Sequence, residues 1–119
     1  MQRIATVVPF YGVLSHTSGP LDEKLGFDRA KKPLAPLDAG RTLRCPLLGF
    51  FGAQDAIVPM SDVDALRSQL LASGQPAELR VFEGAGHAFM NETRPQMYRP
   101  EAAAQAWKEL LAFLAQRLA

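Results

Sequence analysis

Residues 52–59 are Gly52-Ala-Gln-Asp-Ala-Ile-Val-Pro, and residues 83–89 are Glu83-Gly-Ala-Gly-His-Ala-Phe. Each stretch follows an apolar run that is typical of a buried strand, at residues 47–51 and 79–82. The first stretch places an Asp in a glycine-containing turn, and the second places a His in another. Because the carboxyl ends of parallel strands meet at one edge of a sheet, we expect these two side chains to lie close together.

Three apolar runs predict strands, at residues 4–11, 47–51 and 78–82. Unbroken hydrophobicity of this length suits strands that are covered on both faces of a parallel sheet. Pro9 cannot donate a hydrogen bond to a neighbouring strand, so the first strand should end near it. Its two apolar sides and its place at the edge of a small sheet make residues 4–10 a surface for association.

Two helices are expected, one between the later strands and one after them, with at most a short helix near residues 21–30 in the irregular stretch 13–44. Ser61 is expected to cap the first helix and Gly74 to end it, while Pro100 begins the second. Alternating strands and helices predict one α/β domain over residues 1–119, with a small, mostly parallel sheet between helices in three layers. The apolar faces expected to pack on the sheet are Val63, Leu66, Leu70 and Leu71, then Ala103, Trp107, Leu110, Leu111, Leu114 and Leu118.

Composition excludes several classes of partner. The 119 residues include 13 basic and 12 acidic ones, for a net charge of +1, and no run of like charge stands out. We therefore expect no nucleic-acid or membrane partner. No apolar stretch approaches the roughly 20 residues that span a bilayer, and no export signal is visible. A single Cys fits a cytoplasmic protein, and the two His and scattered carboxylates show no metal-ligand spacing. We expect no cofactor.

Asp55 and His87 each allow two interpretations. Small neighbours leave the His87 imidazole accessible, as a general base requires, although a loop histidine often only bonds a backbone carbonyl. Asp55 could satisfy its own turn amides, and the same carboxylate could hold the imidazole tautomer. The two roles of Asp55 can coexist. Asp55 and His87 follow successive strands in that order along the chain. This order favours their being the second and third members of a nucleophile-Asp-His triad.

The first member of such a triad is not found. No Gly-x-Ser-x-Gly or Gly-x-Cys-x-Gly segment occurs in the sequence. Cys45 precedes Pro46 at the opposite end of its strand from the Asp and His loops, and His16 sits in a polar stretch where we expect it to be solvated. The serines lack the strand-to-helix turn that exposes a nucleophilic oxygen: these are Ser15, Ser18, Ser61, Ser68 and Ser73.

Residues 45–119 resemble the carboxyl-terminal part of the dienelactone hydrolase family of α/β-hydrolases. The resemblance covers essentially the whole chain but only about half of the family's domain. The residues that carry it are Pro46-Leu-Leu-Gly-Phe-Phe-Gly-Ala-Gln-Asp55, Val58-Pro59, Gly84-Ala-Gly-His-Ala-Phe-Met-Asn91, Arg94-Pro95, Tyr98, Ala106-Trp107 and, in the opening strand, Pro9-Phe-Tyr-Gly12.

The resemblance implies a partial α/β-hydrolase fold and a reaction in which a Cys or Ser attacks an ester or lactone carbonyl. On that pattern His87 is the general base and Asp55 orients it, while the nucleophile and the oxyanion-hole amides lie upstream of Met1. Asn91 stands where the family has an Arg that helps to hold the substrate carboxylate, and Arg94 is nearby. These two are the candidate substrate-binding residues.

Three functions follow from these patterns. The chain is expected to be part of a hydrolase of small carboxylic esters or lactones, inactive by itself for want of a nucleophile. One alternative is a non-catalytic half-domain that associates with a second copy, and another is a complementing subunit of a split hydrolase. The exposed edge at residues 4–10 predicts a homodimer.

Overall fold

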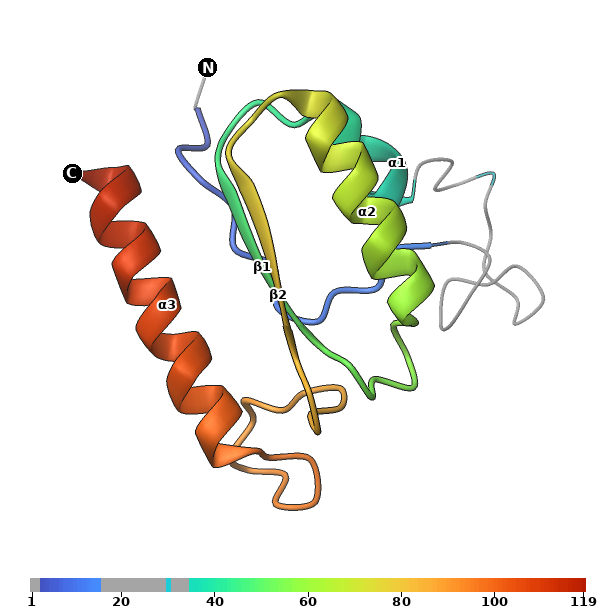
Figure 1. Ribbon diagram of the computed structural model, residues 1–119, viewed down its shortest axis with the longest axis vertical. Coiled ribbons are helices and arrows are strands. Elements are labelled where there is room, and N and C mark those ends of the chain that lie inside the picture. The colour runs from blue at the N-terminus through green and yellow to red at the C-terminus, as the bar shows by residue number, and fades with distance from the viewer. Residues whose placement is uncertain (1–2, 16–29, 31–34) are drawn as a thin grey trace.

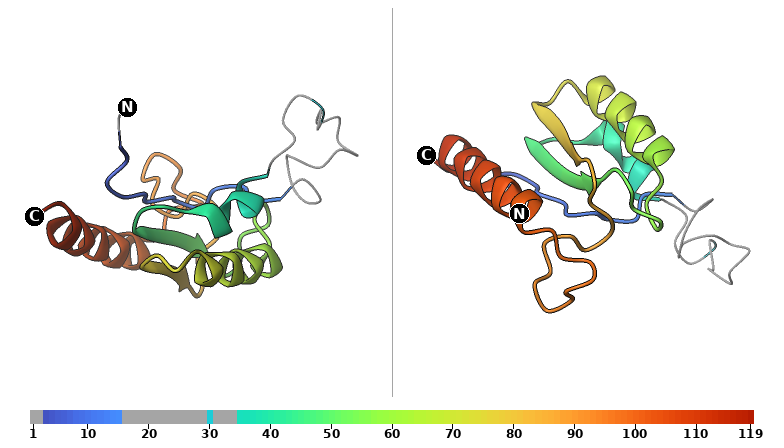
Figure 2. Two further views of the ribbon diagram at one scale, coloured as in Figure 1. Left: turned by 90° about the horizontal axis from the view of Figure 1, so that it is seen from above. Right: turned by 60° about the horizontal axis from the view of Figure 1, so that its bottom comes forward.

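The computed structural model describes residues 3–15, 30 and 35–119. Helix α3 covers one face of a small sheet, and α1 and α2 cover the other, so the predicted three layers are present (Figures 1 and 2). The short helix predicted near residues 21–30 falls almost wholly outside the described residues, as do His16 and Ser18. The elements are α1 (Pro36–Ala39), the 3-10 helix η3 (Gly40–Thr42), β1 (Leu47–Gly52), α2 (Met60–Ser73), β2 (Ala77–Phe82) and α3 (Pro100–Leu118).

Strands β1 and β2 pair in parallel, from Leu47 opposite Ala77 to Gly52 opposite Phe82. Both strands were predicted, and each is one residue longer than its apolar run suggested. A crossover through α2 joins them, as parallel pairing requires. The carboxyl ends of both strands therefore lie at the same edge of the sheet (Figure 1).

The predicted first strand is wrong as a regular strand. Residues 3–11 run beside β1, but they form only two isolated parallel bridges, Val7 to Leu47 and Phe10 to Phe50. The Pro9 carbonyl accepts a hydrogen bond from the Phe50 N–H at 2.9 Å. In a regular parallel ladder, residue 9 would also donate a hydrogen bond from its own N–H to β1. Proline has no N–H, so the ladder breaks there. The segment still brings its carboxyl end to the same edge as β1.

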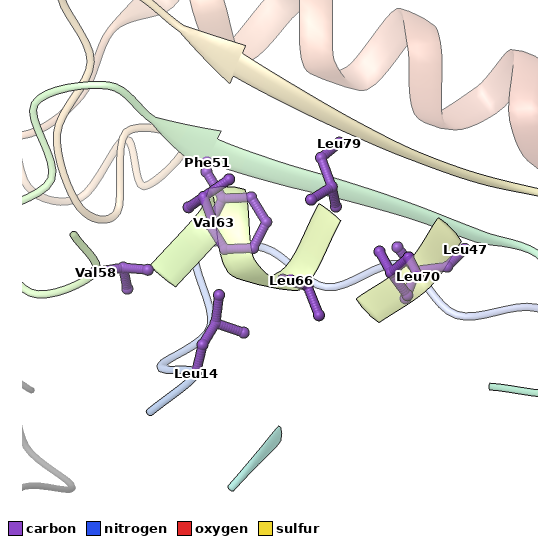
Figure 3. Close-up of a cluster of buried hydrophobic side chains, with 8 residues drawn as sticks. All are labelled: Leu14, Leu47, Phe51, Val58, Val63, Leu66, Leu70 and Leu79. Carbon is purple, nitrogen blue, oxygen red and sulfur yellow. The ribbon is translucent and has the colours of Figure 1, made fainter. Parts of the chain in front are cut away.

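Burial on both faces of β1 organises two cores. Alternate residues face opposite ways along a strand, so Phe50 points toward α3 and Phe51 toward α2, and both are fully buried. Figure 3 shows the cluster on the α2 side, made of Leu14, Leu47, Phe51, Val58, Val63, Leu66, Leu70 and Leu79. The cluster on the α3 side is made of Leu48, Phe50, Ala85, Phe89, Ala106 and Leu110.

Helix α2 differs from prediction at its start and at one apolar position. Its N-cap is Pro59, whose extended backbone precedes the helix, so Ser61 lies inside the first turn and does not cap it. Leu71 is 79% exposed, because one residue after the buried Leu70 the helix has turned by about 100° toward solvent. Gly74 ends the helix in the left-handed conformation at φ 72°, as predicted.

Helix α3 begins at Pro100 as predicted, but it buries a narrower face than its apolar residues suggested. Ala103, Ala106 and Leu110 are buried against the sheet. Trp107 is 55% exposed and was wrongly assigned to the buried face, together with the exposed Leu111 and Leu118. Because each residue turns the helix by about 100°, Ala106 faces the sheet and the next residue, Trp107, faces solvent. No helix within the described residues is long and apolar enough to cross a membrane.

Candidate active site

Asp55 lies in the turn that follows β1 and is held by backbone hydrogen bonds. Its N–H donates to the Gly52 carbonyl at 3.2 Å. Its Oδ1 accepts from the N–H groups of Ile57 at 2.7 Å and Val58 at 2.9 Å. The side chain is fully buried. The turn-stabilising interpretation of Asp55 is therefore confirmed, and it uses only one of the two carboxylate oxygens.

The second oxygen of Asp55 faces His87. Its Oδ2 lies 2.9 Å from His87 Nδ1, so the predicted approach of the two side chains is present at the carboxyl edge of the sheet. A carboxylate can only accept, so Nδ1 carries the proton and Nε2 of the neutral imidazole is left with its lone pair. The His87 side chain is 26% exposed, whereas that of Asp55 is 0% exposed. The arrangement is a partly accessible base fixed by a buried acceptor.

The His87 loop is bound directly to the end of β1. The Gln54 N–H donates to the Ala85 carbonyl at 3.0 Å, and the Ala85 side chain is fully buried. A Cβ on Gly52 would lie 2.7 Å from the Gly86 carbonyl oxygen and 2.8 Å from the Ala85 carbonyl carbon. These are backbone atoms that cannot swing aside. Gly52 is therefore required for the two loops to approach closely enough for the hydrogen bond between Asp55 and His87.

Tyr11 forms an aromatic wall beside the imidazole and was missed as a site residue from the sequence. Its ring centroid lies 5.1 Å from that of His87 and 5.5 Å from that of Phe89, and both contacts are edge-to-face. Burial raises the pKa of Tyr11 above its ordinary value of 10.0. Its sequence signals were its place at the end of the first apolar run and its membership of the Pro9-Phe-Tyr-Gly12 stretch that resembles the family.

The candidate substrate-binding residues lie in the turns after His87. Asn91 Oδ1 accepts from the Thr93 N–H at 3.1 Å and from its hydroxyl at 2.6 Å, so it stabilises a local turn. Arg94 is exposed. In the part of the chain that the structure describes, no hydrogen bond joins either residue to the imidazole. Their role toward a substrate stays a prediction.

Cys45 lies at the opposite end of β1 from the Asp55 turn, and three of the described serines belong to α2. Cys45 precedes β1, with the whole strand between it and Asp55. Ser61, Ser68 and Ser73 belong to α2, and the Ser73 hydroxyl donates to the Leu70 carbonyl at 2.6 Å. Over residues 3–15, 30 and 35–119, no group of three or more His, Cys, Asp or Glu side chains could hold a metal ion.

A sequence model of the dienelactone hydrolase family matches residues 1–118. The chain belongs to the dienelactone hydrolase family. A Salmonella typhimurium relative named "Putative carboxymethylenebutenolidase" is 35% identical over 114 residues, which are 96% of this chain and 38% of that protein. This dienelactone hydrolase family chain thus spans well under half the length of that relative.

Solved structures give the same fold. A crystal structure of a "Putative Dienelactone Hydrolase" from Klebsiella pneumoniae superposes with a TM-score of 0.76 and 32% identity, covering 93% of this chain and 42% of that one. Esterase 2 of Thermogutta terrifontis, phosphorylated by paraoxon, superposes with a TM-score of 0.69 and 27% identity over 94% of this chain and 40% of its own. This dienelactone hydrolase family member has a partial α/β-hydrolase fold.

Proposed function

We propose that this chain supplies the general base and its orienting carboxylate to a hydrolase of carboxylic esters or lactones. The observation that carries the proposal is the 2.9 Å hydrogen bond between His87 Nδ1 and the buried Asp55 Oδ2. That bond selects the tautomer whose Nε2 can accept a proton, and a carboxylate there stabilises the imidazolium that forms. Because the chain covers 38% of its Salmonella relative, we place the nucleophile and the oxyanion-hole donors in polypeptide beyond these 119 residues.

The proposed chemistry uses His87 twice. In the first half-reaction Nε2 takes the proton of a Cys or Ser nucleophile as it attacks the carbonyl, and gives that proton to the departing alcohol oxygen, which leaves an acyl-enzyme. In the second, Nε2 takes a proton from the water that attacks the acyl carbonyl and returns it to the nucleophile as the carboxylic acid departs. In a lactone, the alcohol oxygen stays attached to the acyl group through the opened ring. The relatives' names support the substrate class, since a butenolide is a lactone and an esterase acts on esters. Both substrates share one carboxylic ester bond.

A chimera tests the role of His87. The segment that precedes the match in the Salmonella relative is joined to this chain, and hydrolysis of p-nitrophenyl acetate and dihydrocoumarin is measured. We expect turnover that falls by about a thousandfold or more in His87→Ala, because the base is lost. His16→Ala, which changes the other histidine, is the control and should leave the rate unchanged.

Two outcomes contradict this role. One is a folded chimera that hydrolyses neither substrate, or that keeps its rate in His87→Ala. The other concerns the 119-residue chain alone, which we expect not to form an acyl-enzyme. Stoichiometric labelling of that chain by an acylating probe, lost in His87→Ala, would show that it contains a nucleophile after all.

A second candidate function, self-association, is favoured by the unlike edges of the sheet. Strand β2 carries charges that discourage edge pairing, with Arg80 bonded to Glu78 at 2.8 Å and to Glu109 at 3.1 Å. The opposite edge, residues 4–10, is apolar, and Ile4 is 72% exposed. We propose that this edge pairs with a second copy of the chain. On this alternative the chain is a self-associating half-domain, or a complementing subunit of a split hydrolase.

Sedimentation at micromolar concentration measures this association. We expect a two-fold dimer that Ile4→Lys converts to monomer, because a charge on the edge opposes pairing while the exposed position costs no core contact. Leu71→Lys, at an equally exposed apolar position on α2, should remain dimeric. A wild-type monomer, or dissociation by both substitutions alike, would contradict pairing through residues 4–10.

A further inference from the structure

We propose that Tyr11 is a positioning residue for His87: its aromatic ring sets the plane of the imidazole. The inference rests on the proposed role of His87 as a base. Asp55 contacts the imidazole at Nδ1, and one hydrogen bond fixes a point on a ring without preventing the ring from tilting about it. A second contact, against another part of the ring, is needed to define its plane.

Tyr11 makes that second contact. The Tyr11 and His87 ring centroids are 5.1 Å apart and their planes meet at 62°, an edge-to-face geometry that aromatic rings favour. Tyr11 is itself braced, because its ring also meets Phe89 at 5.5 Å and 69° and Phe10 at 6.2 Å and 63°. Phe89 is fully buried. The imidazole therefore packs against a ring that is anchored in the core on the α3 side.

The backbone of Tyr11 is held in an unfavourable conformation to reach this place. Its φ is 38°, in the region that side-chain-bearing residues avoid, and its N–H donates to the Phe50 carbonyl at 2.6 Å. Among the described residues, only Tyr11 and Ala88 combine a non-glycine side chain with positive φ. One packs on His87 and the other follows it in the chain. Such strain gathers where the surrounding structure fixes a functional group.

The edge-to-face contact gives this role to the Tyr11 ring and not to its hydroxyl. Phe at position 11 keeps the edge-to-face contact, whereas Asn tolerates a left-handed backbone but has no ring. Tyr11→Phe and Tyr11→Asn therefore separate the aromatic contact from the backbone conformation. Tyr98→Asn, which changes the other tyrosine, is the matched control.

Nitrogen-15 and proton NMR of the 119-residue chain provides the test. In the wild type we expect nuclear Overhauser contacts between the Tyr11 and His87 rings, and a His87 Nδ1 proton that exchanges slowly with water. Tyr11→Asn should speed that exchange by roughly three- to tenfold, the equivalent of one lost aromatic pair. Tyr11→Phe and Tyr98→Asn should exchange like the wild type. Backbone amide spectra of β1 and β2 verify that each variant is folded.

Several results would overturn the inference. Wild-type spectra without contacts between the two rings would do so even if Tyr11→Asn failed to fold. Unchanged exchange in a folded Tyr11→Asn would show that the ring does not hold the imidazole. If the His87 Nδ1 proton exchanged as fast in Tyr11→Phe as in Tyr11→Asn, the effect would belong to the hydroxyl and not to the ring. None of these readouts needs hydrolysis, so an inactive chimera would refute the proposed function while the positioning of His87 by Tyr11 is decided separately.

Discussion

Replacing Asp55 by Ala is expected to lower the free energy of unfolding by about 3–4 kcal/mol, because three donors lose their acceptor at once. The donors are the N–H groups of Ile57 and Val58, at 2.7 and 2.9 Å, and Nδ1 of His87, at 2.9 Å. The carboxylate is completely buried, so water cannot reach the same place without rearrangement of the turn. Denaturant unfolding followed by circular dichroism measures the loss.

Asp55→Asn separates the structural role of this residue from its catalytic one. Its amide oxygen can still accept from the two turn N–H groups, so the loss of stability should be only about 1 kcal/mol. Its NH₂ group then faces His87 Nδ1, which must become the acceptor. The proton moves to Nε2, the nitrogen that has to accept a proton from the nucleophile. Hydrolysis by the chimera should fall by roughly four orders of magnitude, as a wrong His tautomer does in a Ser-His-Asp triad.

Nitrogen chemical shifts of the imidazole identify the tautomer directly. We expect the Nδ1–H form in the wild type and the Nε2–H form in Asp55→Asn. Asp64→Asn, at an exposed position on α2, is the control and should change neither the tautomer nor the stability. If Asp55→Asn and Asp55→Ala destabilised the chain equally, and Asp55→Asn left the His87 tautomer unchanged, Asp55 would stabilise its own turn without orienting His87.

Gly52→Ala is expected to separate the two loops of the site. The new Cβ would lie 2.7 Å from the Gly86 carbonyl oxygen and 2.8 Å from the Ala85 carbonyl carbon, distances that a real Cβ does not adopt. The loop that carries His87 must move, because backbone atoms cannot rotate away as a side chain can. We expect a loss of about 3 kcal/mol in unfolding free energy, at the upper end of overpacking effects, and loss of the protected Nδ1 proton of His87.

The matched control for this substitution is Gly86→Ala, in the same loop. A Cβ there would meet only the Gln54 carbonyl oxygen, at an ordinary 3.6 Å, so stability and the His87 proton should change little. Thermal unfolding and proton NMR of the two variants measure both effects. If Gly52→Ala kept a stable fold with an intact His87 proton signal, the close approach at Gly52 would not be what holds the loops together.

Most elements of the fold could be predicted from local pattern. Apolar runs of strand length identified β1 and β2, and helix-end signals identified Gly74 and Pro100. The predictions that were wrong depend on neighbours in space. Ser61 is a good capping residue, but α2 begins at Met60 and its N-cap is Pro59, two residues before Ser61. The interruption at Pro9 was predicted from its missing N–H, but the residues before it also form no regular strand, only the single bridge from Val7 to Leu47, which their apolar pattern did not reveal.

The meeting of Asp55 with His87 followed from strand order alone, because parallel strands joined by a crossover must end at one edge. Which face of α3 is buried was decided by packing, because each residue turns the helix by about 100° and both Ala106 and Trp107 belong to apolar stripes. The contact of Tyr11 with His87 joins residues 76 positions apart (87 − 11). No local pattern encodes it, because the pairing of residues 3–11 with β1 and the fold of the His87 loop must both form before the two rings can touch.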